Sequence, residues 1–387
     1  MDSRKMTTLI RNARLISPDL DIPGGALLLE DGRIAAVVRP EQALPAADES
    51  IDVGGCVVMP GFIDIHSHGA DGHDVCDNSL DAIRHIAWRK LQEGVTTWLP
   101  TTLTQPRESL EEIAGKCAEY MAAPEFCRVP GLHVEGPFIN PRHVGAQNPA
   151  FVRPPDFGEL MRLHAIAPVR IVSLAPELDG AGDFIRRATA AGIICSAAHT
   201  SATAAEILAA KGLGLRHLTH FCNAMTPLHH REIGAVGAGL LDDALMLELI
   251  CDGIHLCPDM LRLISRFVAI GRLMLVTDSM AASWLERGEV KLGGLEVIVE
   301  NGRAVLKQGG ALAGSALRFN EGLRIMAETT GLPLPNLAAT TSWNQARALG
   351  LDGFGKLEAG FHADLVVLDA DFSVRKTFVG GEFRGGW

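Results

Sequence analysis

Aromatic side chains are scarce in this chain of 387 residues, at 5% with a single tyrosine. A groove lined by aromatic rings, as used to hold oligosaccharides, is therefore not expected. Basic residues are also in the minority, because 35 Lys and Arg face 46 Asp and Glu and give a formal net charge of −11. Nucleic-acid-binding proteins carry a basic surface, so nucleic acid is not an expected partner.

Membrane, disulfide and nucleotide-binding signals are missing as well. No run of about 18 apolar residues occurs, the length that begins to span a bilayer, so no membrane partner is expected. Residues 1–12 contain no apolar core of a signal peptide, which predicts a cytoplasmic protein. None of the eight cysteines lies in a Cys-x-x-Cys pair, which favours buried free thiols over disulfides or a cysteine-bound zinc. No Gly-x-x-x-x-Gly-Lys loop occurs, so nucleotide phosphates are not expected.

The chain does contain a regular alternation of strand and helix patterns, which predicts an α/β fold. Helical patterns lie between most of the strands, although glycines at 234, 237 and 239 favour a loop before Met246. This alternation predicts a (β/α)8 TIM-type barrel over residues 60–354. A β-hairpin that turns at Asn301-Gly302 is expected as an insertion near residues 289–310. The eight apolar or β-branched runs end near His66, Leu99, Glu135, Ala175, Ala198, His220, Asp252 and Asp278.

Both ends of the chain show a different pattern, of short strands and turns. Residues 25–30 and 33–38 flank an Asp31-Gly32 turn that is typical of a hairpin. Residues 364–368 form another apolar strand pattern near the C-terminus. We therefore expect residues 1–59 and 355–387 to form together a small β-sandwich domain.

Side chains with metal-binding chemistry follow five of the expected strands. The C-terminal ends of all barrel strands open onto one face, so residues far apart in the sequence are expected to converge there. A lone histidine after a strand is more often a satisfied polar residue than a ligand, and the chain has 14 histidines. Matches at five strand ends in barrel order favour a divalent-metal site, for Zn²⁺ first and Fe²⁺ second. The residues are His66, His68, Glu135, His199, His220 and Asp278; the histidines expected to be surface or structural residues are 73, 85, 143, 164, 217 and 362.

A metal site of this kind suits metal-assisted hydrolysis. A bound divalent cation polarises a carbonyl and lowers the pKa of water towards about 7. Asp278 is expected to take the proton from that water and then to give it to the leaving group. The alternative interpretation of Asp278 is a helix N-cap, because aspartate is a preferred capping residue.

Longer motifs surround these residues. The segment PGFIDIHSH at residues 60–68 and the segment NQARALGL at residues 344–351 resemble the opening and closing segments of the amidohydrolase superfamily. More specific are GLHVEGPF at 131–138, THFCNAM at 219–225, DGIH at 252–255, VTD at 276–278 and LAGS at 312–315. Together, in order and over nearly the whole chain, these motifs resemble the N-acetylglucosamine-6-phosphate deacetylase family.

This resemblance implies hydrolysis of the acetamide of N-acetylglucosamine 6-phosphate to glucosamine 6-phosphate and acetate, in amino-sugar catabolism. It implies that Glu135, His199 and His220 are the principal metal ligands and that Asp278 transfers the proton. A second ion at His66 and His68 is possible only with Glu135 as the bridging ligand. The number of ions per chain is therefore left at one or two. The residues implied to hold the sugar phosphate are Ala146, Gln147, Asn223, Ala224, Arg231, Asp252, His255, Ala311, Leu312 and Ala313, with Arg231 reaching the neighbouring active site of a homodimer.

Three alternatives stay open. A deacetylase acting on the galactosamine isomer is one, because the two hexosamines differ only in whether one hydroxyl is axial or equatorial. A cyclic amidase of the dihydroorotase type is disfavoured, because no lysine stands at a strand end to become the carbamylated bridging ligand. A non-catalytic barrel used as a binding module is disfavoured by the retained Asp278 beside a complete ligand set.

Overall fold

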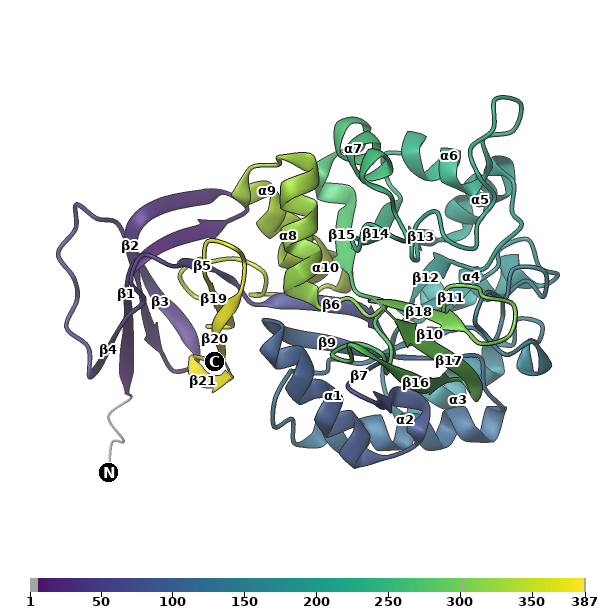
Figure 1. Ribbon diagram of the computed structural model, residues 1–387, viewed down its shortest axis with the longest axis horizontal. Coiled ribbons are helices and arrows are strands. Elements are labelled where there is room, and N and C mark those ends of the chain that lie inside the picture. Colours follow the sequence, from purple (N-terminus) through teal and green to yellow (C-terminus); the bar gives the residue numbers. More distant parts are fainter. Residues whose placement is uncertain (1–5, 301, 386–387) are drawn as a thin grey trace.

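The computed structural model describes residues 6–300 and 302–385, which form a barrel and a smaller sheet beside it (Figure 1). The first and the last of the described strands both belong to the smaller sheet. Residues 1–5 of the N-terminal segment and Asn301 of the predicted hairpin turn lie outside the described residues. Within the described residues, no helix is both long enough and apolar enough to cross a membrane.

Eight parallel strands form the barrel, and each strand pairs with the next one along the chain. They are buried almost throughout, as expected of parallel strands covered on both faces. The predicted (β/α)8 class is confirmed. The strands are β6 Phe62–Ser67, β9 Val95–Thr102, β10 Leu132–Glu135, β11 Val169–Leu174, β12 Ile194–Ala197, β13 Leu215–Leu218, β14 Met246–Ile250 and β15 Leu273–Val276.

Individual hydrogen bonds join the first barrel strand, β6, to the residues that follow the last one, β15. The hydroxyl of Thr277 donates to Oδ2 of Asp64 at 2.6 Å, and the N–H of Asp278 donates to the carbonyl of His66 at 2.9 Å. This closure places His66 and Asp278, two predicted site residues from opposite ends of the barrel sequence, next to each other. A short hairpin of β7 (Gly69–Ala70) and β8 (His73–Asp74) follows β6.

Helices cover the outside of the barrel and lie between most of its strands. Several begin at side-chain caps: Ser79 caps α1, and Thr203 with Glu206 forms a capping box on α5. A π-helical segment at Ala339–Trp343 connects the last two helices. The helices are α1 Leu80–Gln92, α2 Arg107–Ala122, α3 Phe157–Ile166, α4 Ala181–Ala190, α5 Ala204–Leu213, α6 Gly234–Leu241, α7 Pro258–Phe267, α8 Phe319–Thr330, α9 Leu334–Ala338 and α10 Asn344–Leu349.

The segment between β13 and β14 differs from the prediction, because α6 stands where the glycines favoured a loop. The glycines serve close packing instead. A Cβ on Gly239 would lie 2.5 Å from a ring atom of Phe221 and 2.6 Å from Cδ1 of Leu218. Gly239, one of the residues that weaken the helical pattern, therefore allows this helix to pack against the barrel.

The two ends of the chain share one eight-stranded sheet, in the order β21-β20-β19-β5-β1-β2-β3 with β4 beside β1. The sheet encloses a core of its own that includes Ile10, Leu27 and Phe378. The turn between its strands β2 and β3 also contacts the segment that leads into β19, since the N–H of Ala363 donates to the carbonyl of Gly32 at 2.9 Å. The strands are β1 Thr7–Ser17, β2 Leu20–Glu30, β3 Arg33–Val38, β4 Glu49–Asp52, β5 Val57–Pro60, β19 Leu365–Leu368, β20 Val374–Val379 and β21 Glu382–Gly385.

The insertion after β15 is a three-stranded antiparallel sheet of β16 (Arg287–Leu292), β17 (Leu295–Glu300) and β18 (Arg303–Leu306). The predicted hairpin corresponds to β17 and β18. Strand β16 was missed because only its last residue is buried, so it has no apolar alternation. Leu292 and Val297 of this sheet pack against Leu103 and Met280 near the C-terminal ends of the barrel strands.

Candidate active site

The predicted ligand residues meet at the C-terminal mouth of the barrel. Strand β6 carries His66 and is followed by His68, β10 ends in the carboxylate of Glu135, and the other residues follow β12, β13 and β15. Residues 199, 220 and 278 have φ angles of 46°, 36° and 48°, in the left-handed region that non-glycine residues rarely adopt. Such backbone strain concentrates where the surrounding structure holds functional side chains in place. The convergent residues are His66, His68, Glu135, His199, His220 and Asp278.

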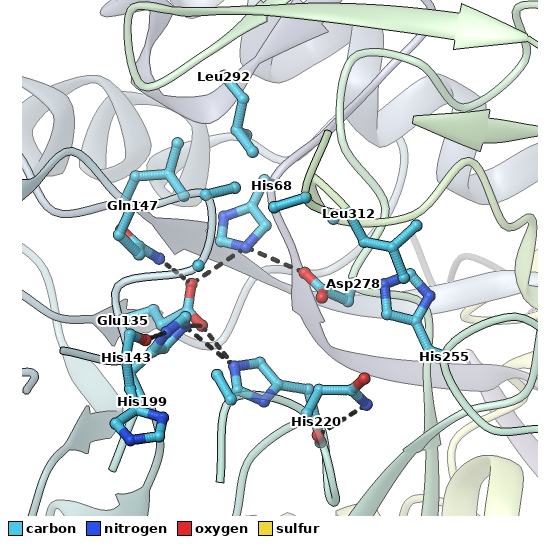
Figure 2. A pocket seen from close by; sticks show the side chains of 17 residues that line it. His68, Glu135, His143, Gln147, His199, His220, His255, Asp278, Leu292 and Leu312 are labelled. Atoms are coloured by element: carbon cyan, nitrogen blue, oxygen red, sulfur yellow. Dashed lines mark hydrogen bonds and ion pairs between the residues drawn. The ribbon is translucent and has the colours of Figure 1, made fainter. Parts of the chain in front are cut away.

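Glu135, His199 and His220 form a compact triangle of ligand atoms (Figure 2). Oε1 of Glu135 lies 3.1 Å from Nε2 of His220 and 3.2 Å from Nε2 of His199. The two imidazole nitrogens are 3.2 Å apart. All three side chains are buried. Imidazole nitrogens and a carboxylate oxygen are a common ligand set for divalent transition metals.

His66 and His68 bring a second set of nitrogen atoms to Glu135. Nε2 of His68 lies 3.3 Å from Oε2 of Glu135 and 3.2 Å from Oδ1 of Asp278, and Figure 2 shows its ring between the two carboxylates. Nε2 of His66 lies 3.3 Å from Nε2 of His68 and 3.4 Å from Oδ1 of Asp278. Glu135 therefore stands between two groups of imidazoles, as a bridging ligand would.

The partners of the outer ring nitrogens determine which nitrogen faces the centre. Nδ1 of His199 lies 2.7 Å from the carbonyl oxygen of His143, and Nδ1 of His68 lies 3.1 Å from that of Thr101. A carbonyl oxygen only accepts, so Nδ1 carries the hydrogen in both rings and Nε2 turns its lone pair inward. Lone pairs this close repel one another unless a cation or protons lie among them. The residues therefore fit a divalent metal.

The same crowding shifts the pKa values of the group. Burial lowers the pKa of His68, but hydrogen bonds to Asp278 and Glu135 outweigh it and raise that pKa to about 9. Burial raises the pKa of Glu135, but the nearby imidazoles, His66 first, hold it well below its usual range. The carboxylates are thus ionised, and the raised pKa values of His66 and His68 mean that a metal ion displaces protons from these two rings when it binds.

Asp278 faces the imidazoles from the end of β15. Its main chain is held on both sides, since its N–H donates to the carbonyl of His66 and its carbonyl accepts from the N–H of Ser315 at 2.8 Å. Burial raises the pKa of its carboxyl, but His66 and His68 hold that pKa well below its usual range. The chain continues into a bridge and a turn rather than a helix, so the helix-cap interpretation does not apply.

A cavity of about 330 Å³ opens from this group of ligands. Its size lies within the range of small-molecule pockets. The ligands His68, Glu135, His199 and His220 line it together with Asp278, whereas His66 is buried behind them. The predicted substrate residues that line it are Ala146, Gln147, Asn223, Ala224, His255, Ala311 and Leu312.

Three predicted substrate residues do not line the cavity. Arg231 lies in an exposed loop, where its guanidinium is 2.6 Å from Nε2 of His230. Asp252 stands behind His255, with its Oδ2 2.6 Å from Nδ1 of that ring. Ala313 is fully buried beside the insertion sheet.

Gln147 has a second role besides lining the cavity. Its Nε2 donates to Oε2 of Glu135 at 2.6 Å, and its Oε1 accepts from the N–H of Thr104 at 2.6 Å. The two bonds fix the direction of the amide. Gln147 therefore orients the carboxylate that stands between the two groups of imidazoles.

Several residues of the site were missed by sequence reasoning. Leu103 and Leu292 add apolar surface to the cavity, and no polar motif marks them. His143, expected to be structural or at the surface, contributes its carbonyl oxygen as the acceptor for Nδ1 of His199. Glu248, deeper in the barrel, was also missed; its Oε1 lies 3.4 Å from Nδ1 of His217. The sequence feature that could have indicated Glu248 is a charged residue inside the otherwise apolar strand MLELI.

Comparisons with known proteins agree with this geometry. The amidohydrolase family model matches residues 57–384. An N-acetylglucosamine-6-phosphate deacetylase of Bacillus subtilis (strain 168) is 37% identical over 381 residues, which cover 96% of each chain. An N-acetylgalactosamine-6-phosphate deacetylase of Escherichia coli O157:H7 is 36% identical over 384 residues, which cover 97% of this chain and 99% of that one. The structure of a mutant N-acetyl-D-glucosamine-6-phosphate deacetylase from Mycobacterium smegmatis, in complex with N-acetyl-D-glucosamine-6-phosphate, matches with a TM-score of 0.91 at 32% identity, covering 99% of this chain and 100% of that one.

Proposed function

The chain belongs to the amidohydrolase family, and on that premise we propose that it hydrolyses the acetamide of N-acetylglucosamine 6-phosphate to glucosamine 6-phosphate and acetate. The observation that carries this proposal is the triangle of Glu135, His199 and His220 at one end of a sugar-sized cavity, with Asp278 facing it. The similarity to a deacetylase solved with this phosphorylated sugar supports the choice of substrate.

The ligand set indicates where a divalent metal would be held. Glu135, His199 and His220 suit one ion, and His66 and His68 with the same carboxylate suit another, so we propose one or two per chain. Zn²⁺ is the proposed ion and Fe²⁺ the alternative, because imidazole and carboxylate ligands suit both. When bound, the ion polarises the acetamide carbonyl and lowers the pKa of the attacking water towards about 7.

Asp278 moves the proton in this reaction. Its ionised carboxylate takes a proton from the water as the water oxygen attacks the acetamide carbon. The same carboxyl then gives the proton to the amide nitrogen, and the C–N bond breaks. Acetate and the free amine of glucosamine 6-phosphate are released. One side chain thus acts first as base and then as acid.

The phosphate end of the substrate is proposed to lie at Asn223, Ala224 and His255. Figure 2 shows His255 on the opposite side of the ligand group from Gln147. Asp252 favours the charged form of the His255 ring, because its carboxylate accepts from Nδ1 and raises the pKa of that ring. A charged imidazole and nearby N–H donors suit the dianionic phosphate.

Arg231 is proposed to bind the phosphate of a neighbouring subunit in a homodimer. It does not line the cavity of its own chain, and its fork of N–H groups suits a phosphate. Mixing Arg231→Ala with Asp278→Asn chains tests this. Hybrid dimers should regain activity, since one of their sites combines an intact Asp278 with an intact Arg231 from the partner. A mixture that stays as inactive as its parents contradicts the dimer proposal.

Two further expectations belong to this proposal. A cytoplasmic location is favoured because a phosphorylated sugar carries charge that hinders its passage across a bilayer. Residues 1–59 with 355–387 are proposed as one domain and residues 60–354 as the other. The sheet shared by both chain ends supports that division.

The decisive experiment measures acetate release from the 6-phosphates of N-acetylglucosamine and N-acetylgalactosamine, together with elemental analysis of the same preparation. We expect a stoichiometric divalent metal and a higher kcat/KM for the glucosamine isomer. A preference for the galactosamine isomer would instead support the alternative to which the Escherichia coli relative points. Hydrolysis of a cyclic amide without acetate release would favour a cyclic amidase and refute the proposal.

A further inference from the structure

A carboxylate stands inside the barrel beneath the ligand group, where apolar side chains usually fill the space. Glu248 is at the centre of β14 and is fully buried. Its two oxygens face two imidazoles: Oε2 lies 3.4 Å from Nδ1 of His66, and Oε1 lies 3.4 Å from Nδ1 of His217. A buried charge is costly unless it is paired, so this carboxylate is held for a purpose other than packing.

We infer that Glu248 is a positioning residue, which orients His66 so that a second divalent ion binds at His66, His68 and Glu135. An ionised carboxylate can only accept, so Nδ1 of His66 carries the hydrogen. The lone pair of Nε2 then points to the mouth, 3.3 Å from Nε2 of His68 and 3.8 Å from Oε1 of Glu135. The inference rests on the proposed function only in that it needs a divalent-metal site.

The neighbouring His133 does not compete for this role. Its ring packs edge-on against His66, with the ring centroids 4.7 Å apart. Both of its nitrogens are engaged, Nδ1 with the carbonyl of Ile65 at 2.8 Å and Nε2 with the hydroxyl of Ser173 at 2.7 Å. His133 therefore acts as a wall that limits the rotation of His66. Among the described residues, Glu248 is the side chain that faces Nδ1 of His66.

The test is a metal titration of the chelated protein, with Zn²⁺ as the probe and the bound ion measured by elemental analysis. The wild type should reach about two ions per chain. Glu248→Gln keeps the shape of the side chain but removes its charge, so the second ion should bind about 10- to 100-fold more weakly while the first is unchanged. At saturating Zn²⁺ the variant should recover its second ion.

Glu159→Gln is the matched control, because it also removes a fully buried carboxylate. Glu159 lies on α3 and is paired with Arg107 and Arg153. The control variant should leave both metal affinities unchanged. In a His66→Asn background, Glu248→Gln should weaken metal binding no further, because its effect passes through His66. If Glu248→Gln does not fold, Glu248→Asp retracts the charge and should weaken the second ion as well.

Two results would overturn the inference: a wild type that stays at about one ion per chain in saturating Zn²⁺, or position-248 variants that bind the second ion as tightly as the wild type. Acetate release by the wild type separates this inference from the proposed function. A deacetylase with a single ion refutes the role of Glu248 alone. A protein that binds both ions but releases no acetate refutes the proposed function alone.

Discussion

Oδ2 of Asp252 lies 2.6 Å from Nδ1 of His255, and Oδ1 of the same carboxylate accepts the N–H of His255 at 2.8 Å. The side chain thus holds both the ring and the backbone of a residue that lines the cavity. Burial lowers the pKa of His255, but the hydrogen bond and charge of Asp252 outweigh it and raise that pKa above its ordinary value. The charge of Asp278 raises it further, and the charge of Arg303 lowers it.

Asp252→Asn should therefore shift the pH dependence of substrate binding. Without the carboxylate the pKa of His255 falls, so the imidazolium is lost at a lower pH and the KM for the phosphorylated sugar begins to rise at a lower pH than in the wild type. Steady-state kinetics from about pH 5 to pH 9 measure the shift. Asp259→Asn, which changes an exposed carboxylate on α7, is the control. Identical KM profiles for Asp252→Asn and the wild type would contradict the prediction.

Asp278→Asn should keep the fold, the metal and the substrate affinity but lose turnover. The amide cannot take a proton from water or return one to the amine, so kcat should fall by about 10²- to 10⁴-fold. Elemental analysis and calorimetric binding of the substrate establish that the site is otherwise intact. Near-normal kcat in this variant would mean that another group transfers the proton.

Metal uptake by the chelated protein should release protons near neutral pH. The pKa of His68 is raised to about 9, so its ring holds a proton at any lower pH, and that proton competes with the ion. Metal affinity should therefore rise as the pH rises towards about 9. Titration calorimetry in two buffers with different enthalpies of ionisation counts the released protons. Equal heats in the two buffers would show that no proton leaves.

Lys90→Met should destabilise the fold strongly. The Nζ atom of Lys90 is fully buried and lies 3.0 Å from Oδ2 of Asp64 and 3.2 Å from Oε2 of Glu93. Removing the ammonium leaves both carboxylates buried without their cation, a change that costs about 3 to 5 kcal/mol. Urea unfolding followed by circular dichroism measures it.

Lys307→Met is the control for the loss of a lysine, because Lys307 forms exposed ion pairs with Glu289 and Glu296 on the insertion sheet. Its urea midpoint should stay at the wild-type value. If Lys90→Met also unfolds at the wild-type urea midpoint, the buried cluster around Lys90 does not stabilise the closure between β6 and β15.

The barrel and the chemistry of its mouth were within reach of the sequence because they depend on local pattern and on one rule of topology. Strand patterns ending at His66, Glu135 and Asp278 are local, and parallel crossovers force such ends onto one face. Strand β16 and helix α6 were not within reach. The first buries a single residue, and the second depends on the close contact of Gly239 with Phe221, which are 18 positions apart in the sequence.

The sequence by itself determined which kinds of atoms meet at the mouth of the barrel, since strand order and strand ends follow from periodicity along the chain. Only the tertiary structure decided how each of them is held. It placed Asp252 behind His255, left Arg231 outside its own cavity and set Glu248 beneath His66. These relationships depend on distances between strands and loops that are remote in sequence, and no local pattern encodes which nitrogen of a ring finds an acceptor.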